Sequence, residues 1–362
     1  MKYLYLLICI CFISCSEIKT KEQKCPELSQ KEVDEFVNEE AELFSIQIFE
    51  DHKRILLSNH SDQHDEYILS NSNCSAKHIK FPLEKVVVLS SPHLGMIEAL
   101  GKTDKVIAIG NEYLTVNPKL KGIKKVGEGE TIDIENVILL EPDAILCNKI
   151  QTPPSAYKKI REAGIPIIEC SEYLEKTPLA QAEWIKFFGV LFNENGKADS
   201  IYNAVSRDYN RLKILAQKEA KPRVFFNKKY GDIWYMPSGD HLASYLLRDA
   251  NATYEWIHKP ETGSLELSFE TVIEHCLEDD IWINPGSATL NELVNEDSRY
   301  TEFKAYKNNM IFDRNKQRAV NGANGYFETG ALNCNLVLQD LIKIFHPNLF
   351  QDKPFTYYEK LK

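Results

Sequence analysis

The sequence has no uninterrupted apolar run long enough to cross a bilayer, which needs roughly 20 apolar residues. Its N-terminal stretch, MKYLYLLICICFIS, has one charge at Lys2 and an apolar run over residues 4–13, and the polar stretch SEIKTKEQK follows soon afterwards. A short charged start, an apolar middle and a small residue at the end are typical of a secretory signal peptide. We therefore predict a signal peptide over residues 1–14 rather than a membrane-spanning helix.

Paired cysteines and clustered histidines are absent as well. The nine cysteines form no Cys-x-x-Cys motif, which argues against a zinc cluster and against a dense disulfide framework. The nine histidines form no group of the roughly four converging ligands that a zinc site needs, so we expect no metal site. Cys15 ends the stretch FISC, which looks like a bacterial lipobox. We expect Cys15 to carry acyl chains that anchor the protein to a membrane, and a plain secretory signal is the alternative.

Basic stripes and catalytic motifs are missing too. The net charge is −10 and no basic stripe interrupts the mixed charges, which argues against nucleic acid as a partner. No Gly-x-Ser-x-Gly elbow, Gly-x-Gly-x-x-Gly loop or phosphate-binding loop occurs. We therefore expect no catalytic residue and no cofactor, and a lipid-tethered hydrolase is the enzymatic alternative.

The chain does contain a succession of short β-branched strands and helices. Even without residues 1–14, the 362-residue chain exceeds the ~250–300 residues at which single cores stop growing, so two lobes are expected. Gly101 and Gly164 close two helices that lie between strands, which is the βαβ pattern of an α/β fold. Residues 179–218 carry apolar side chains at helical spacing, interrupted only by NENG, and predict a long helix.

Two segments, DIENVILLEPDAILCN and SFETVIEHCLEDDIWIN, repeat one order of features: a polar cap, a glutamate, a helix, an acidic turn, a strand and an asparagine. We predict an α/β protein with two equivalent Rossmann-like lobes joined by a long interdomain helix. The predicted parts are a tether at 15–42, a first lobe at 43–180, a linker helix region at 181–218 and a second lobe at 219–362. The first lobe is expected to open with a β-hairpin that pairs LFSIQIFED with DEYILSN across a polar connection.

Three segments, VVVLSSPHLGMIEALGKTDKVIAIG, KKVGEGETIDIENVILLEPDAIL and IREAGIPIIE, resemble in their order and spacing the substrate-binding proteins of ABC importers for iron–siderophore complexes and cobalamin. The resemblance covers about residues 81–347 and includes the closing LVLQDLIKIFHP. It implies a periplasmic binding protein fold of the helical-backbone type. It also implies a monomer in the bacterial envelope that faces the periplasm, captures a metal-bearing chelate and delivers it to an ABC permease and its ATPase. A ferric siderophore is the preferred ligand, and cobalamin, another corrinoid or haem is the alternative.

Ligands of open α/β sheets bind at the carboxyl ends of strands, and the loops there carry cations and aromatic side chains. Cations suit anionic chelates, and planar rings suit catecholate or corrin faces. The alternatives are that His93 faces solvent, that the aromatic residues belong to the core, and that the loop at 314–332 is a solvated connection. The residues expected to contact the ligand are His93, Tyr113, Asn148, Lys228, Lys229, Tyr235, Trp256, Arg314, Arg318 and Tyr326.

Glu135 and Glu270 occupy matched places, each the third residue counted from a polar cap, Asp133 or Ser268. The resemblance implies that these two glutamates pair with arginines of the permease, one from each lobe. The alternative is that each glutamate only stabilises its own helix, because its negative charge lies near the positive N-terminal end of the helix dipole. That interaction is worth ~0.3–1 kcal/mol for each glutamate.

Overall fold

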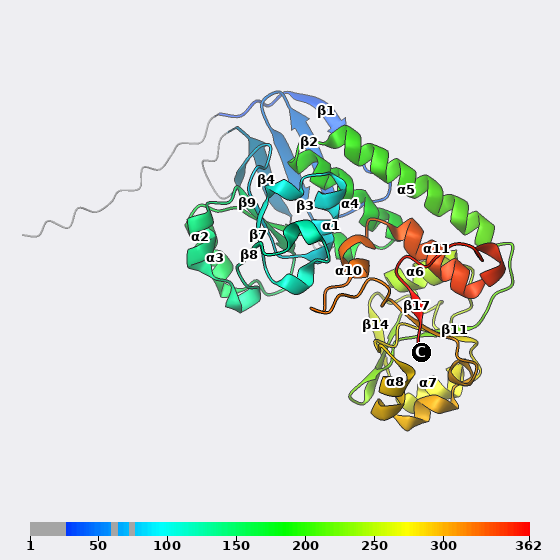
Figure 1. The fold of residues 1–362 in the computed structure, drawn as a ribbon. Helices are drawn as coiled ribbons and strands as arrows, with labels where there is room; N and C mark the ends of the chain where they lie inside the picture. Colours follow the sequence, from blue (N-terminus) through cyan, green and yellow to red (C-terminus); the bar gives the residue numbers. More distant parts are fainter. Residues whose placement is uncertain (1–26, 59–63, 72–76) are drawn as a thin grey trace, which may run out of the picture.

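The computed structural model describes residues 27–58, 64–71 and 77–362, so the predicted signal peptide and Cys15 lie outside the described residues. Figure 1 shows two α/β parts, with a long helix, α5, running from one to the other. We call residues 27–177 the first half and residues 221–362 the second half. Within the described residues, no helix combines the length and apolarity needed to cross a membrane.

The central sheet of the first half is entirely parallel, with strand order β10-β9-β6-β7-β8. The central β6 is buried along its whole length, as expected for a strand covered on both faces. This arrangement confirms the predicted βαβ succession. The strands are β6 (Val86–Val88), β7 (Val106–Ile109), β8 (Lys124–Lys125), β9 (Ala144–Asn148) and β10 (Ile167–Cys170), and the helices are α1 (Ser91–Ala99), α2 (Ile134–Leu140) and α3 (Ser155–Glu162).

The N-terminal region forms a five-stranded sheet, and the predicted two-stranded hairpin is wrong. The segment expected to be a polar connection contains the strand β3. Side chains of a strand point alternately to its two faces, so Ile55 and Leu57 of KRILL share one face and are buried. The predicted tether is also too long. Residues 32–36 form an edge strand, and the backbone N–H groups of residues 39–41 donate to the buried Glu183 carboxylate. The strands are β1 (Glu32–Phe36), β2 (Phe44–Phe49), β3 (Lys53–Leu57), β4 (Asp65–Ser70) and β5 (His78–Lys80).

Two helices, α4 (Pro178–Leu191) and α5 (Asn195–Ala216), connect the halves. They are separated at the predicted NENG break, where Asn193 adopts a left-handed backbone with φ 57°. The start of α5 packs Tyr202 into the core of the first half, and its end packs Leu212 into the core of the second half. Every residue of α4 is buried. The predicted long connecting helix is therefore confirmed as α5, with α4 packed beside it.

The second half is not a copy of the first. Its main sheet has the order β11-β15-β16-β17 and ends in an antiparallel strand, and a separate three-stranded sheet lies beside it. The strands are β11 (Val224–Phe226), β12 (Lys229–Tyr230), β13 (Ile233–Pro237), β14 (Ser264–Leu267), β15 (Ile281–Ile283), β16 (Ile311–Asp313) and β17 (Glu359–Lys360). The helices are α6 (Leu242–Asp249), α7 (Phe269–Cys276), α8 (Leu290–Glu296), α9 (Lys304–Lys307), α10 (Gly325–Thr329) and α11 (Cys334–Phe345).

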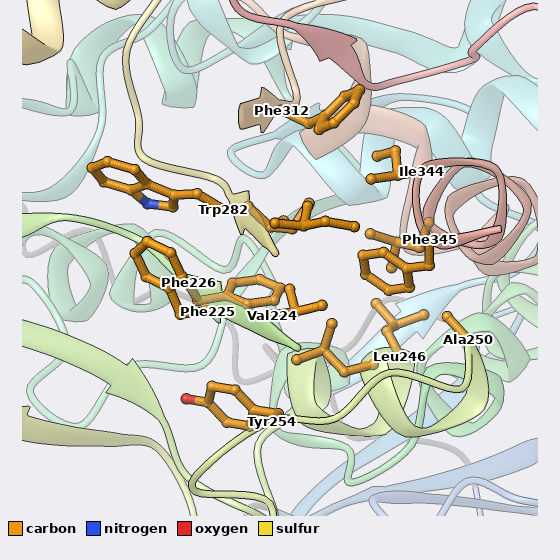
Figure 2. Close-up of a cluster of buried hydrophobic side chains, with 14 of the residues drawn as sticks. Val224, Phe225, Phe226, Leu246, Ala250, Tyr254, Trp282, Phe312, Ile344 and Phe345 are labelled. Atoms are coloured by element: carbon orange, nitrogen blue, oxygen red, sulfur yellow. The ribbon is translucent and has the colours of Figure 1, made fainter. Parts of the chain in front are cut away.

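Aromatic packing fixes the second sheet against its helices. Figure 2 shows side chains of β11, among them Phe225, near Trp282 of β15 and near residues of α6 and α11. The Phe225 ring stacks on Trp282 with centroids 5.0 Å apart and on Phe303 with centroids 4.9 Å apart. Trp282 is fully buried. The carboxyl ends of these strands are therefore held in fixed positions.

The C-terminal tail completes this sheet. The buried Asp340 carboxylate of α11 accepts hydrogen bonds from the backbone N–H groups of residues 356–358. This anchor leads the chain into β17 beside β16 and buries Tyr358, which is 1% exposed.

Candidate ligand-binding site

Three adjoining cavities share Leu242, the first residue of α6, and we call them together the central groove. The Arg314 cavity has a volume of about 230 Å³ and lies within the second half. The Pro92 cavity (about 180 Å³) and the Tyr173 cavity (about 490 Å³) are each lined by residues from both halves. The groove thus lies where the two halves meet.

The Arg314 cavity forms at the carboxyl ends of three parallel strands. Asn227 follows β11, Asn284 follows β15 and Arg314 follows β16, and all three line the cavity. Both asparagines have left-handed backbones, with φ 58° and 57°, a conformation that asparagine tolerates better than most residues. The cavity therefore occupies the position where open α/β sheets bind ligands.

Arg314 is a partly buried cation. Burial opposes its charge, but the Tyr326 and Tyr358 side chains and the nearby Asp313 carboxylate favour it, so the pKa of Arg314 is raised overall. Its guanidinium lies 4.9 Å from the Tyr326 ring centroid and 5.2 Å from that of Phe327. Within the described part of the chain it forms no ion pair, and its buried Nε has no hydrogen-bond partner. The neighbouring Asp313 carboxylate instead accepts from the backbone N–H groups of Gly286 and Ser287, at 2.6 and 3.2 Å.

His241 contributes a donor to the same cavity. Its Nδ1 accepts a hydrogen bond from the Ala243 backbone N–H at 3.0 Å and so caps α6. The ring proton therefore lies on Nε2, which is a donor and not a free metal ligand. Burial lowers the pKa of His241, so the ring is neutral near pH 7.

A segment of the second half docks on the first half. We call residues 314–333 the strap, and its helix α10 lies between the two parts in Figure 1. Glu328 of the strap is 1% exposed and accepts from Thr115 Oγ1 and from the Val116 backbone N–H, the latter at 2.6 Å. Burial raises the pKa of the Glu328 carboxyl. Asn321 also donates to the Glu112 carbonyl at 2.9 Å.

Of the residues predicted to contact a ligand, the structure brings Arg314 and Tyr326 together in the central groove. Two others are buried and cannot face it. His93 is 0% exposed, because it is the third residue of α1 and turns inward against Phe188, with its Nε2 3.1 Å from Glu172 Oε1. Trp256 is 6% exposed and packs on Tyr254 in the core. The burial of His93 and Trp256 therefore contradicts the prediction that they contact a ligand, and His93 does not face solvent either.

Three of the four cations predicted to contact the ligand, Lys228, Lys229 and Arg318, do not line the central groove. Lys228 pairs with Glu296 at the end of α8, and Lys229 Nζ lies 2.7 Å from Asp297 Oδ2. A hydrogen bond from Arg299, together with Lys229, holds the pKa of Asp297 well below its usual range. Both lysines are thus neutralised by partners that are distant in sequence. Arg318 is exposed and does not line the groove.

Tyr113, Asn148 and Tyr235 also lie outside the central groove. Tyr113 is 49% exposed and donates to Glu128 at 3.3 Å, and Tyr235 is 36% exposed on β13. Sequence reasoning missed His241, Asn227, Asn284 and Tyr358, which line the Arg314 cavity. An available signal was the asparagine directly after a strand in VFFN and IWIN.

Glu135 and Glu270 hold equivalent positions at the starts of α2 and α7. Asp133 caps α2 by accepting from the Asn136 N–H, and Ser268 caps α7 by accepting from the Thr271 N–H. Both glutamates are exposed, and neither lines the central groove. Figure 1 places α2 and α7 in different halves, far from each other. In the described ranges, no group of three or more His, Cys, Asp or Glu side chains is arranged to hold a metal ion.

The chain is similar in sequence to known proteins. An uncharacterized lipoprotein of Methanocaldococcus jannaschii is 26% identical over 326 residues, which cover 85% of this chain and 76% of the relative. A vitamin B12-binding protein of Vibrio cholerae is 30% identical over 89 residues, 25% of this chain and 32% of that protein.

Solved structures share the fold. A periplasmic heme binding protein from Pseudomonas aeruginosa matches with a TM-score of 0.59 and 17% identity, covering 76% of this chain and 96% of that one. A possible iron-binding (periplasmic solute-binding) protein from Staphylococcus epidermidis matches with a TM-score of 0.58 and 17% identity, covering 73% and 99%. The model of the family described as periplasmic binding protein matches residues 86–317. The chain therefore belongs to the periplasmic binding protein family, the class that its sequence motifs indicated.

Proposed function

We propose that the protein is the solute-binding component of an ABC importer, which holds a ferric siderophore in the central groove and passes it to the permease. The observation that carries this proposal is Arg314, a partly buried guanidinium at the carboxyl ends of the second-half strands that forms no ion pair within the described residues and whose Nε has no hydrogen-bond partner there. A buried charge of this kind is costly unless a partner compensates it. An anionic chelate supplies that partner.

The charge of the whole chain strengthens this reasoning. Because the net charge is −10, long-range attraction opposes the approach of an anion, and the groove itself has to supply the favourable field. Lys228 and Lys229 are neutralised by Glu296 and Asp297, and Lys176, which lines the Tyr173 cavity, pairs with Glu42. Arg314 is therefore the groove cation that has no ion pair among the described residues. Its planar guanidinium suits oxygen anions, to which it donates two parallel hydrogen bonds.

A corrinoid or haem ligand is the second candidate. The similarity to a vitamin B12-binding protein favours a corrinoid, although it covers only 25% of this chain. The rings of Tyr326 and Phe327, which both line the Pro92 cavity, offer apolar surface to a flat macrocycle.

Anchoring and docking belong to the same proposal. An acylated Cys15 holds the protein at the membrane surface, near the permease. Glu135 and Glu270 are exposed, lie outside the groove and belong to different halves, which suits a permease that contacts both. Because α5 packs into the cores of both halves, we expect only a modest closing motion of the halves on ligand binding.

The test is a titration of the purified protein, monitored by tryptophan fluorescence, with ferric siderophores and with cobalamin in parallel. We expect saturable binding of a ferric siderophore and no binding of the same siderophore without iron. Tight binding of cobalamin together with no binding of ferric siderophores would reject the first proposal in favour of the second. The iron content and visible spectrum of protein purified from cells grown in rich medium provide an independent check.

A further inference from the structure

The Arg314 cavity is too small for a whole chelate. Its volume of about 230 Å³ lies below the range of roughly 300–1,000 Å³ that is typical of pockets for complete small ligands. It adjoins the larger Tyr173 cavity, with which it shares His241 and Leu242. The Arg314 cavity therefore has room for one arm of a ligand that fills the groove between the halves.

The donors in this cavity select the chemistry of that arm. Arg314 brings a positive charge and an Nε–H that has no partner among the described residues. His241 brings a neutral ring whose Nε2–H is a donor, because Nδ1 is engaged at the start of α6. A carboxylate is the common side-arm group that accepts from both donors and also neutralises the guanidinium.

The cavity also contains a buried hydrogen-bond acceptor, for which the ligand arm has to supply a donor. Asn284 is 6% exposed, and its side-chain amide is hydrogen-bonded to the Tyr358 hydroxyl. Its Oδ1 is buried and has no partner in the part of the chain that the structure describes. An unpartnered buried acceptor is costly, so a hydroxyl or N–H beside the carboxylate satisfies it.

The walls of the cavity are held rigidly by the C-terminal tail. The three backbone N–H groups bound by Asp340 position Tyr358, whose ring meets Tyr326 edge-on with centroids 6.2 Å apart and an interplanar angle of 82°. Tyr326 in turn lies under the Arg314 guanidinium. The donors and the acceptor therefore keep their positions before the ligand arrives, which favours selectivity.

We propose that the Arg314 cavity is a subsite for one carboxylate-bearing arm of the ligand, preferably an arm with a hydroxyl next to the carboxylate. The proposal rests on the proposed function, since it names the class of chelate that the same groove selects. Arg314 and His241 hold the carboxylate, and Asn284 accepts from the neighbouring hydroxyl. A chelate whose arms end in neutral amides or hydroxamates leaves the guanidinium unpaired.

The experiment compares two probes: ferric citrate, which has two carboxylate arms and a hydroxyl on the carbon that bears its central carboxylate, and ferrichrome, a hydroxamate chelate without carboxylates. Arg314→Met keeps the length of the side chain and removes its charge. Arg248→Met is the matched control, because Arg248 also lies over a tyrosine ring, Tyr245 at 4.8 Å, but lines none of the three cavities. Asn284→Asp is a second variant, which places a negative charge in the cavity at a backbone conformation that aspartate also tolerates.

We expect the wild-type protein to prefer ferric citrate. Arg314→Met is expected to weaken the binding of ferric citrate by about 10- to 150-fold, because one charge-assisted hydrogen bond is lost. Asn284→Asp is expected to weaken the binding of ferric citrate at least about tenfold. Arg248→Met leaves it unchanged. Preference for ferrichrome, or equal effects of Arg314→Met on both probes, would overturn the subsite while leaving the proposed function standing. Failure of the wild-type protein to bind any ferric chelate would refute the proposed function and the subsite together.

Discussion

Replacing Glu328 with alanine removes the main polar attachment of the strap to the first half. In the wild-type protein the Glu328 carboxylate accepts from Thr115 Oγ1 and from the Val116 backbone N–H, and it is almost completely buried. Because Arg314, Tyr326 and Glu328 belong to one segment, this attachment also positions the wall of the Arg314 cavity. The variant therefore affects both the stability of the protein and the shape of its groove.

The expected magnitude follows from the two donors that lose their acceptor. A buried donor left without a partner costs about 1–3 kcal/mol, so two such donors cost about 2–6 kcal/mol. The alanine variant also avoids the burial of a carboxylate, which offsets part of that loss, since burial raises the pKa of Glu328. We expect the free energy of unfolding to fall by about 2–4 kcal/mol.

The raised pKa predicts a dependence on pH with a definite sign. In the native state Glu328 binds a proton more readily than in the unfolded chain, where its pKa is near 4.5. Its contribution to stability therefore decreases as pH rises from 4.5 through the raised native pKa, and is constant outside that window. Glu328→Gln, which does not titrate, removes this component of the pH dependence.

Urea unfolding across this pH range measures the loss of stability in Glu328→Ala and the pH dependence of stability. Amide hydrogen exchange at Val116 reports directly on its hydrogen bond to Glu328. The exposed Glu274 of α7 provides a control, because Glu274→Ala is expected to change neither measurement. If the Val116 amide exchanged equally slowly in Glu328→Ala and in the wild-type protein, the attachment inferred from the hydrogen bonds would be refuted.

Three further predictions concern other parts of the chain. Glu135→Ala combined with Glu270→Ala is expected to leave chelate affinity within a factor of a few while abolishing uptake in cells, and a collapse of affinity would place these residues in the ligand site. Cys15→Ser is expected to move the protein from the membrane fraction to the soluble fraction, and unchanged partition would reject lipid anchoring. Gly189→Ala is expected to lower the free energy of unfolding by about 1–3 kcal/mol, because a Cβ there would lie 2.5 Å from the Ala198 Cβ of α5; full stability would show that α4 and α5 have room to separate.

The sequence predicted the elements that local residues determine. The β-branched residues 86–88 form the strand β6, and Gly101 and Gly164, which were predicted to end helices in the first half, both adopt positive φ. These features are readable because strand burial and helix termination depend on neighbouring residues. The family resemblance, which rests on several such segments in order, is confirmed.

Features that depend on distant partners were not predictable. β17 forms because Asp340 anchors the tail beside β16, so it has no strong local signal. The same reason explains the incorrect site predictions. Nothing near Lys229 in the sequence indicates its partner Asp297, and nothing near His93 indicates that Phe188 covers it.

The central claim is that a ligand binds between the two halves, and hydrogen exchange with and without a bound ferric chelate tests it most directly. We expect slower amide exchange in residues 173–176 of the first half and, at the same time, in residues 240–243 and 314–330 of the second half. Protection confined to one half, or located at α2 and α7 alone, would contradict it.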